Sequence, residues 1–362
     1  MAATTPAEPP AVPLRGLERL PARLPVVLVW IASVAVLGLA TLTSFRLGFA
    51  DDAATLLRVN GPRVLFAATC GGALALAGTL RLRAGRVGAL DELALFAVAT
   101  GAAGGGFGAA TLLGGAPALP AYAIGALAGA AGLVRLVRAL DRPRRLTNLG
   151  AAAVLVAGIA AAAFAATYTR PWRGDPSDPG AGAALAGFTA WLLGDLSGAT
   201  VTTGVVLLVA LAALLGAAMG ALRVDSRTPL GGIALLAFGA GVGAAGPLPF
   251  VGTLVPRAVR VLAPRASPRA FVLASVIAGA ASVSAIDAVP RLLVGGYDFP
   301  FAVPAEMLAI PIFLGWNRAR LRREVGGAGA AFEALELAVL GGLTLAGVFL
   351  AYTLANVIRT AT

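Results

Sequence analysis

The chain has 362 residues, of which 59% are hydrophobic and 12% charged, and its formal net charge is +11. A soluble domain carries roughly 25% charged residues, so this composition is typical of a polytopic membrane protein. The sequence contains no Lys, Gln or His, and its one Cys, Cys70, lies in an apolar run. It therefore has no P-loop lysine, no Ser-His-Asp or Cys-His nucleophile, no His-bearing zinc site and no intramolecular disulfide. We expect a protein that is not an enzyme and that holds no metal or cofactor.

The N-terminal residues 1–23 are rich in proline and predict a disordered cytoplasmic tail. Apolar runs near the ~20 residues that cross a bilayer then recur along most of the chain. The expected fold class is all-α, a polytopic integral membrane helical bundle. We place its spans at 24–45, 62–80, 90–114, 118–138, 147–169, 200–222, 229–246, 249–262, 270–290, 304–317 and 331–358.

The arginines lie in small groups between these runs. They do not gather on one polar face with stacking aromatics, so we expect no nucleic-acid partner. Arginines concentrate in cytoplasmic loops, and with the N-terminus inside, every inner segment holds at least two of them. This alternation requires that the short, proline-interrupted stretch 249–262 also crosses. It predicts a multi-pass protein of the plasma or inner membrane with its C-terminus outside.

Residues 101–110, "GAAGGGFGAA", resemble a nucleotide-binding loop in composition, but they follow no strand and precede no Gly-Lys. Helix packing or an unwound turn is the interpretation we favour, because irregular backbone at membrane depth is tolerated where it lines a cavity. The candidate pathway-lining residues are Gly101, Gly105, Gly108 and Asn148.

The last third of the chain carries a set of spaced motifs. Residues 246–260 read "GPLPFVGTLVPRAVR", a small-residue run then ends in Asp287 and Arg291, and prolines follow at 300 and 311. This resembles the FecCD permease family of ABC importers for iron-siderophores, haem and cobalamin. The matching positions are Phe250, Gly252, Pro256, Arg260, Asp287, Arg291, Pro300 and Pro311.

Two earlier segments, 60–80 and 186–208, also look like parts of that family, so the resemblance runs in order over residues 24–323. It implies a membrane permease domain of about ten spans, and residues 324–362 would then be an additional C-terminal transmembrane helix. The implied function is the translocation pathway of an importer for such chelates. The implied partners are a second permease copy, an ABC ATPase subunit and an extracytoplasmic substrate-binding protein.

The resemblance also implies that arginines at the outer face receive acidic residues of the binding protein, since opposed charges fix register across an interface. Arg63 and Arg291 correspond by motif position, and Arg58 is a further candidate. The alternative is ordinary snorkelling of arginine at the end of a span. Asp287 and Arg291 lie four apart and could form a structural salt bridge, unless Pro290 ends the helix first.

One departure from the family bears on mechanism. The family carries a long inner segment between its sixth and seventh spans, which forms the helices that couple to the ATPase, and here that connection is only "RVDSRT" (223–228). The alternative function is therefore a divergent relative without ATPase coupling, acting as an accessory or structural subunit or as an uncoupled transporter. No residue identifies the substrate.

Overall fold

The computed structural model describes residues 24–46, 53–84, 199–224, 228–246 and 248–293, with the single positions 128, 194, 196 and 312. The predicted tail 1–23, the glycine-rich segment 101–110, Asn148, Pro300, Pro311 and the predicted helix within 324–362 lie outside the described residues. The boundaries expected for these parts of the chain therefore stay predictions.

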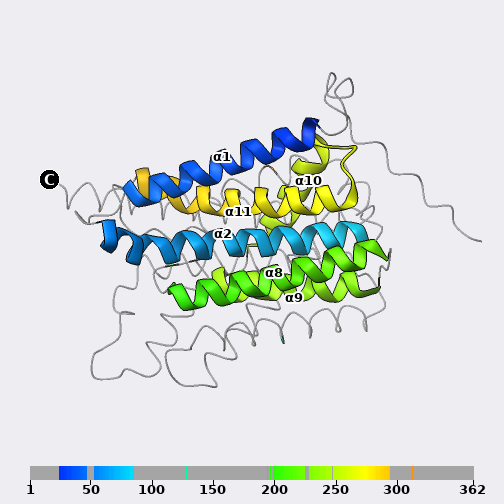
Figure 1. The fold of residues 1–362 in the computed structure, drawn as a ribbon, viewed down its shortest axis with the longest axis horizontal. Helices are drawn as coiled ribbons and strands as arrows, with labels where there is room; N and C mark the ends of the chain where they lie inside the picture. Colours follow the sequence, from blue (N-terminus) through cyan, green and yellow to red (C-terminus); the bar gives the residue numbers. More distant parts are fainter. Residues whose placement is uncertain are drawn as a thin grey trace, which may run out of the picture.

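Six helices make up the described part (Figure 1): α1 (Leu24–Arg46), α2 (Ala53–Ala84), α8 (Val201–Arg223), α9 (Thr228–Ala245), α10 (Pro249–Leu262) and α11 (Pro268–Leu293). A helix is present at six of the predicted spans, and α2 is longer at both ends than the apolar run 62–80. The α10 bounds coincide with the expected ones. The expected all-helical class therefore holds over the residues described.

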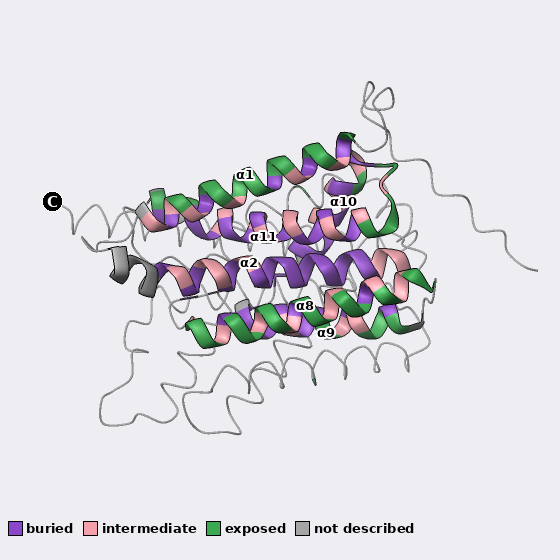
Figure 2. Ribbon diagram, viewed as in Figure 1, coloured by how far each residue is buried: buried purple, intermediate pink, exposed green. Residues whose placement is uncertain are grey.

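Four of these helices are long and apolar enough to cross a membrane: Leu24–Phe45, Asn60–Arg83, Val201–Arg223 and Pro268–Val289. The apolar stretch of α9, Pro229–Ala244, is shorter. In the α2 span 83% of the residues are buried, against 11% in α1 and in α8. Figure 2 shows the same contrast, with α2 buried in the centre and α1 and α8 turning exposed faces outward. Because lipid tails solvate apolar side chains, such outward faces need no protein cover in a bilayer.

Glycines let the other helices approach α2 closely. A Cβ on Gly71 would overlap the carbonyl of Gly279 in α11, and a Cβ on Gly78 would overlap the carbonyl of Gly252 in α10. Small residues permit this backbone contact, which supplies the van der Waals packing that holds helices together in lipid. Helices α10 and α11 are therefore packed tightly against α2.

The helix directions sort the arginines onto two ends of the bundle. Helices α2 and α8 run in parallel, because Leu65 meets Gly204 and Gly72 meets Leu211. Helix α11 runs against them, because Gly71 meets Gly279 and Arg63 meets Asp287, and Figure 1 shows α1 running the same way as α11. One end, called here the arginine end, carries arginines from α2, α8, α10, α11 and the α10–α11 connection: Arg81, Arg83, Arg223, Arg257, Arg260, Arg265 and Arg269. The opposite end carries Arg63 and Arg291. This is the division that the alternation of inner and outer segments predicts.

The connections from α8 to α11 are short. Residues 224–227 join α8 to α9, Gly246 turns the chain after α9 with a φ of 82°, and residues 263–267 join α10 to α11. Only glycine adopts such a positive φ without strain. The connection between α8 and α9, expected from the sequence to be short, is thus four residues long.

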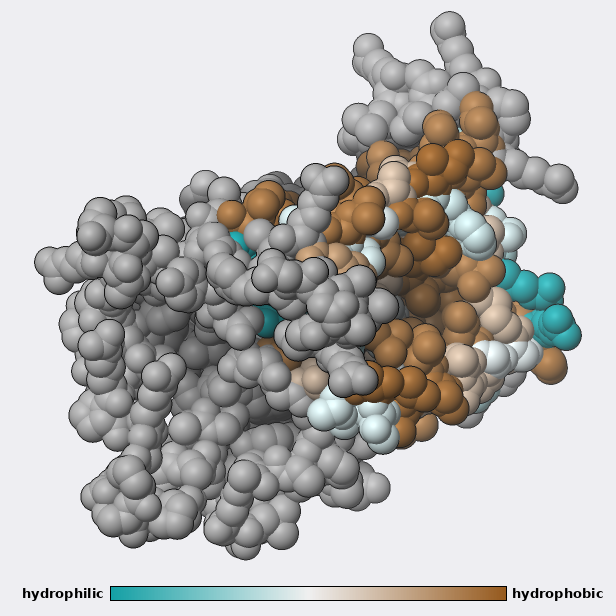
Figure 3. Space-filling model, turned by 60° about the vertical axis from the view of Figure 1, so that its left-hand side comes forward, coloured by the Kyte–Doolittle hydropathy of each residue, from teal (hydrophilic) through white to brown (hydrophobic). Residues whose placement is uncertain are grey.

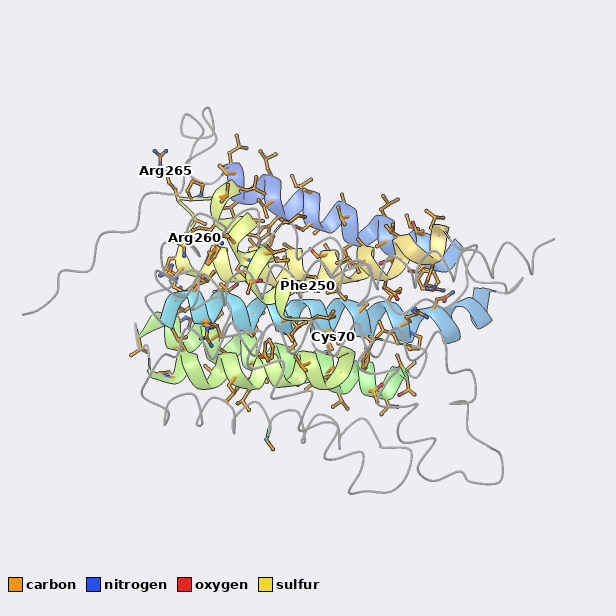
Figure 4. The ribbon with its side chains drawn as sticks, turned by 180° about the vertical axis from the view of Figure 1, so that it is seen from behind. Cys70, Phe250, Arg260 and Arg265 are labelled. Atoms are coloured by element: carbon orange, nitrogen blue, oxygen red, sulfur yellow. The ribbon has the colours of Figure 1, made fainter. Side chains whose placement is uncertain are left out.

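Helix α10 is too short to cross the membrane by itself. Its 14 residues extend about 21 Å, less than the ~30 Å hydrocarbon core. Near its start Gly252 lies against Gly78 of α2, and Arg260 lies toward the arginine end (Figure 4). The chain thus enters through α9 and leaves through α10 at the same end. The alternation of arginines is preserved by a half-length helix where a short full crossing was expected.

Candidate functional site: the Asp287 cluster

Four polar side chains meet between α2 and α11 at the end opposite the arginine end. Asn60 and Arg63 come from α2, and Asp287 and Arg291 come from α11; we call them the Asp287 cluster. Their exposed fractions are only 2%, 5%, 2% and 4% in the same order. Groups so buried must be paired, because an isolated charge is strongly penalised away from water.

Arg63 holds the Asp287 carboxylate side-on. Its Nη2 donates to Oδ1 at 2.8 Å, and its Nε lies 3.0 Å from Oδ1 and 3.1 Å from Oδ2. A guanidinium fork with two donors on one carboxylate is the strong and directional form of ion pair. This contact ties α2 to α11 across 224 positions of sequence.

Arg291 completes the cluster from within α11. Its Nη1 lies 3.8 Å from Asp287 Oδ2, and its Nη2 donates to Asn60 Oδ1 at 3.3 Å. The expected pairing of Asp287 with Arg291 is therefore present, and α11 continues past Pro290 to Leu293. The closer partner of Asp287 is nevertheless Arg63, a contact between helices that sequence spacing did not suggest.

The close packing of the α2 and α11 backbones brings the four side chains of the Asp287 cluster to one level. Arg63 precedes Gly71 by eight residues and Asp287 follows Gly279 by eight residues, so both lie about two helical turns from this close crossing. Antiparallel helices that touch at one level keep such equidistant residues at a common level. The small residues in the middle of the helices thus fix the register of the charged end.

The cluster can position charge but has no constellation for catalysis. Among the described residues no group of three or more Cys, Asp or Glu side chains could hold a metal ion. The amide Nδ2 of Asn60 is buried and has no acceptor in the described part of the chain. The arrangement therefore suits a structural lock between two helices.

At the arginine end, α1, α10 and α11 meet in a small apolar cluster. Val29, Val259, Phe271 and Ala274 form it, and the guanidinium of exposed Arg260 stacks 4.5 Å from the Phe271 ring centre. Cation–π stacking at an exposed site contributes ~0.5–1 kcal/mol. Arg260, predicted as a motif residue, is thus held against α11 by its planar head.

Comparison with known proteins relates one stretch of the chain to a protein family. The profile of the FecCD transport family matches residues 224–318. This stretch belongs to the FecCD transport family. We call residues 224–318 the FecCD segment, and the resemblance drawn from the motifs is confirmed there.

A solved structure agrees in fold over a longer range. It is described as an inward-facing conformation of a metal-chelate type ABC transporter, is 17% identical, and matches with a TM-score of 0.58 over 80% of this chain and 98% of that chain. No curated protein matches the chain. Together with the apolar helices, the family match supports a multi-pass membrane protein, and the solved structure shows the likeness in fold.

Three motif residues of the FecCD segment lie in α10. Phe250, Gly252 and Pro256 are buried in α10, with Gly252 against Gly78 of α2. The first turns of α10 are buried on all sides, and these three residues act on packing. Pro300 and Pro311 also fall in the FecCD segment but outside the described residues, as do Gly101, Gly105, Gly108 and Asn148 before it.

Two of the three predicted docking arginines lie in the Asp287 cluster, and the third lies outside it. Arg63 and Arg291 face Asp287 inside the cluster, whereas Arg58 lies in the first turns of α2, where the helix but not the side chain is described. A docking role for the three stays a prediction. Asn60 was missed, although its place one helical turn before Arg63 in "NGPR" puts both on one face of α2.

Proposed function

We propose that the chain is the permease subunit of an ABC importer for metal chelates of the iron-siderophore, haem or cobalamin type. The observation that carries the proposal is the family match of residues 224–318. The likeness in fold to a transporter described as metal-chelate type supports the cargo class. The partners would be a second permease copy, an ABC ATPase and an extracytoplasmic substrate-binding protein, and the arginine end would face the cytoplasm.

In this proposal the Asp287 cluster lies at the outer face, where the binding protein would dock. Two guanidiniums and the Asn60 amide gather there around one carboxylate. Arg58, in the first turns of α2, would meet an acidic side chain of the binding protein, and the buried cluster would hold α2 and α11 in place beneath it. Opposed charges of this kind steer encounter and fix orientation more than they add affinity.

The experiment is co-purification followed by uptake. The tagged chain is extracted in mild detergent from its native host, and a nucleotide-binding subunit is expected in the eluate. Uptake of radiolabelled cobalamin or of a ferric siderophore should be lost on deletion of the gene and restored by the intact chain. Recovery of the chain without any ATPase, together with unchanged uptake after deletion, contradicts the importer proposal.

The second candidate is a relative without ATPase coupling, acting as an accessory subunit or an uncoupled transporter. The short α8–α9 connection, residues 224–227, favours it, because four residues cannot form the helices through which an ATPase would push. In reconstituted vesicles an uncoupled transporter would move cargo down its gradient without ATP. An accessory subunit would move none and would co-purify with another membrane protein.

A further inference from the structure

A groove runs along the outside of the bundle at the arginine end, between the first half of α1 and the turn that precedes α11. Its volume is about 960 Å³. This is within the usual range of ligand-binding cavities, roughly 300–1,000 Å³. The side chains that line it are Val26, Val27, Trp30, Ile31, Val34, Ala35, Arg265, Ala266, Ser267 and Ala270.

The long wall of the groove is apolar and belongs to a face that no described element covers. Val27, Ile31 and Val34 repeat at helical spacing along α1 and are 49%, 60% and 55% exposed. From Val26 to Ala35 this wall extends about 14 Å along the helix axis. Figure 3 shows apolar surface over the described helices, with hydrophilic side chains gathered toward one edge. In a bilayer such a wall is in contact with acyl chains.

The short end of the groove is polar and positively charged. Arg265 and Ser267 lie there, and Figure 4 shows Arg265 at the extremity of the bundle. Helix α11 begins at Pro268, so the positive end of its dipole points toward the same place. Trp30 also lines the groove, six residues into α1 and about 9 Å from the start of that helix.

We propose that this groove retains one anionic phospholipid of the leaflet that borders the arginine end. Its acyl chain lies along Val27, Ile31 and Val34, and its phosphate lies between Arg265 and the start of α11. An apolar wall with one cationic end matches an amphiphile that has one acidic head, and basic pockets between membrane helices are known to select such heads. The site does not depend on the transport function.

The test uses Trp30 as the reporter of its own groove. A variant with Trp172, Trp191 and Trp316 replaced by Phe is reconstituted into phosphatidylcholine vesicles. Brominated phosphatidylglycerol or brominated phosphatidylcholine is then added at equal mole fraction, and quenching of Trp30 fluorescence is measured. We expect phosphatidylglycerol to be preferred about five-fold, the value for one basic residue near the surface. Raising the salt concentration should reduce the preference.

Two variants decide whether the groove is responsible. Arg265→Ala should abolish the preference, whereas Arg223→Ala, an exposed arginine of the same end that does not line the groove, should leave it intact. Far-UV circular dichroism and gel filtration confirm that both variants fold. Equal quenching by the two lipids, or a preference that survives Arg265→Ala, overturns the proposal. Quenching that begins only after residues 1–23 are deleted also overturns it, because the chain's own N-terminus then fills the groove.

Discussion

Removal of the charge on Asp287 should destabilise the bundle more than any other single change of charge in the described part of the chain. The carboxylate is 2% exposed and lies 2.8 Å from Arg63 Nη2 and 3.8 Å from Arg291 Nη1. With an effective dielectric constant of about 20, these separations correspond to Coulomb attractions of about 6 and about 4 kcal/mol before desolvation is counted. Arg63 is thus the dominant partner.

Asp287→Asn keeps the shape of the side chain and leaves both guanidiniums buried without their carboxylate. Loss of one partner of a buried pair typically costs 3–5 kcal/mol, because the remaining charge is not compensated. We expect Arg63→Met to cost a similar amount. In the double variant both charges of the pair are gone, so its loss should be close to that of one single variant, a coupling energy of about 3 kcal/mol.

The assay is unfolding of the purified chain in mixed micelles by titration with sodium dodecyl sulfate, followed by far-UV circular dichroism. Arg260→Ala is the matched control, since that arginine is exposed and its stacking on Phe271 contributes only ~0.5–1 kcal/mol. If the losses of the two single variants simply add in the double variant, the cluster is not a lock between α2 and α11, and the reasoning is refuted.

Three further predictions use the same unfolding assay. Gly78→Ala should destabilise by several kcal/mol, because the added Cβ overlaps the backbone of Gly252, whereas Gly216→Ala on the open face of α8 should be neutral or stabilising by up to ~1 kcal/mol; equal effects would contradict the close packing of α2 on α10. Gly246→Ala should cost about 1–2 kcal/mol because of its φ of 82°, and an unchanged midpoint would show that the turn after α9 relaxes. Thr200→Ala should cost ~0.5–2 kcal/mol, since Thr200 and Thr203 form a capping box at the start of α8, and Thr200→Ser should recover most of that loss.

Much of the helical layout could be predicted from the sequence because lipid leaves few alternatives. Every backbone polar group in the hydrocarbon must be satisfied within its own segment, so an apolar run of span length is a helix. The bounds of α10 follow from Pro249 at its start and from the proline after its end. Which helix ends lie together could be predicted from the number of arginines in each segment between the spans, and this number is read directly from the sequence.

The Asp287 cluster could be predicted only in part. Spacing within one helix suggested Asp287 with Arg291, because residues four apart share a face. The closer contact with Arg63 depends on how α2 and α11 cross, and this is decided by Gly71 and Gly279, whose partners cannot be read from one sequence. For the same reason arginines expected at the surface are buried between helices. The half-length of α10 was also not apparent, since an arginine count records only where a chain enters and leaves.

The separation of Arg63 and Asp287 along the chain has a consequence for how the protein is made. The two residues are 224 positions apart. At ~5–20 residues per second, a ribosome needs about ten to forty-five seconds to reach Asp287 after Arg63 has left it. During that interval α2 resides in the membrane without its main counter-ion, and the position of Arg63 near the end of the span lets its head reach the interfacial water. Arrival of α11 then draws this arginine out of the water, so closure of the cluster is a late step of assembly that marks the joining of the two halves.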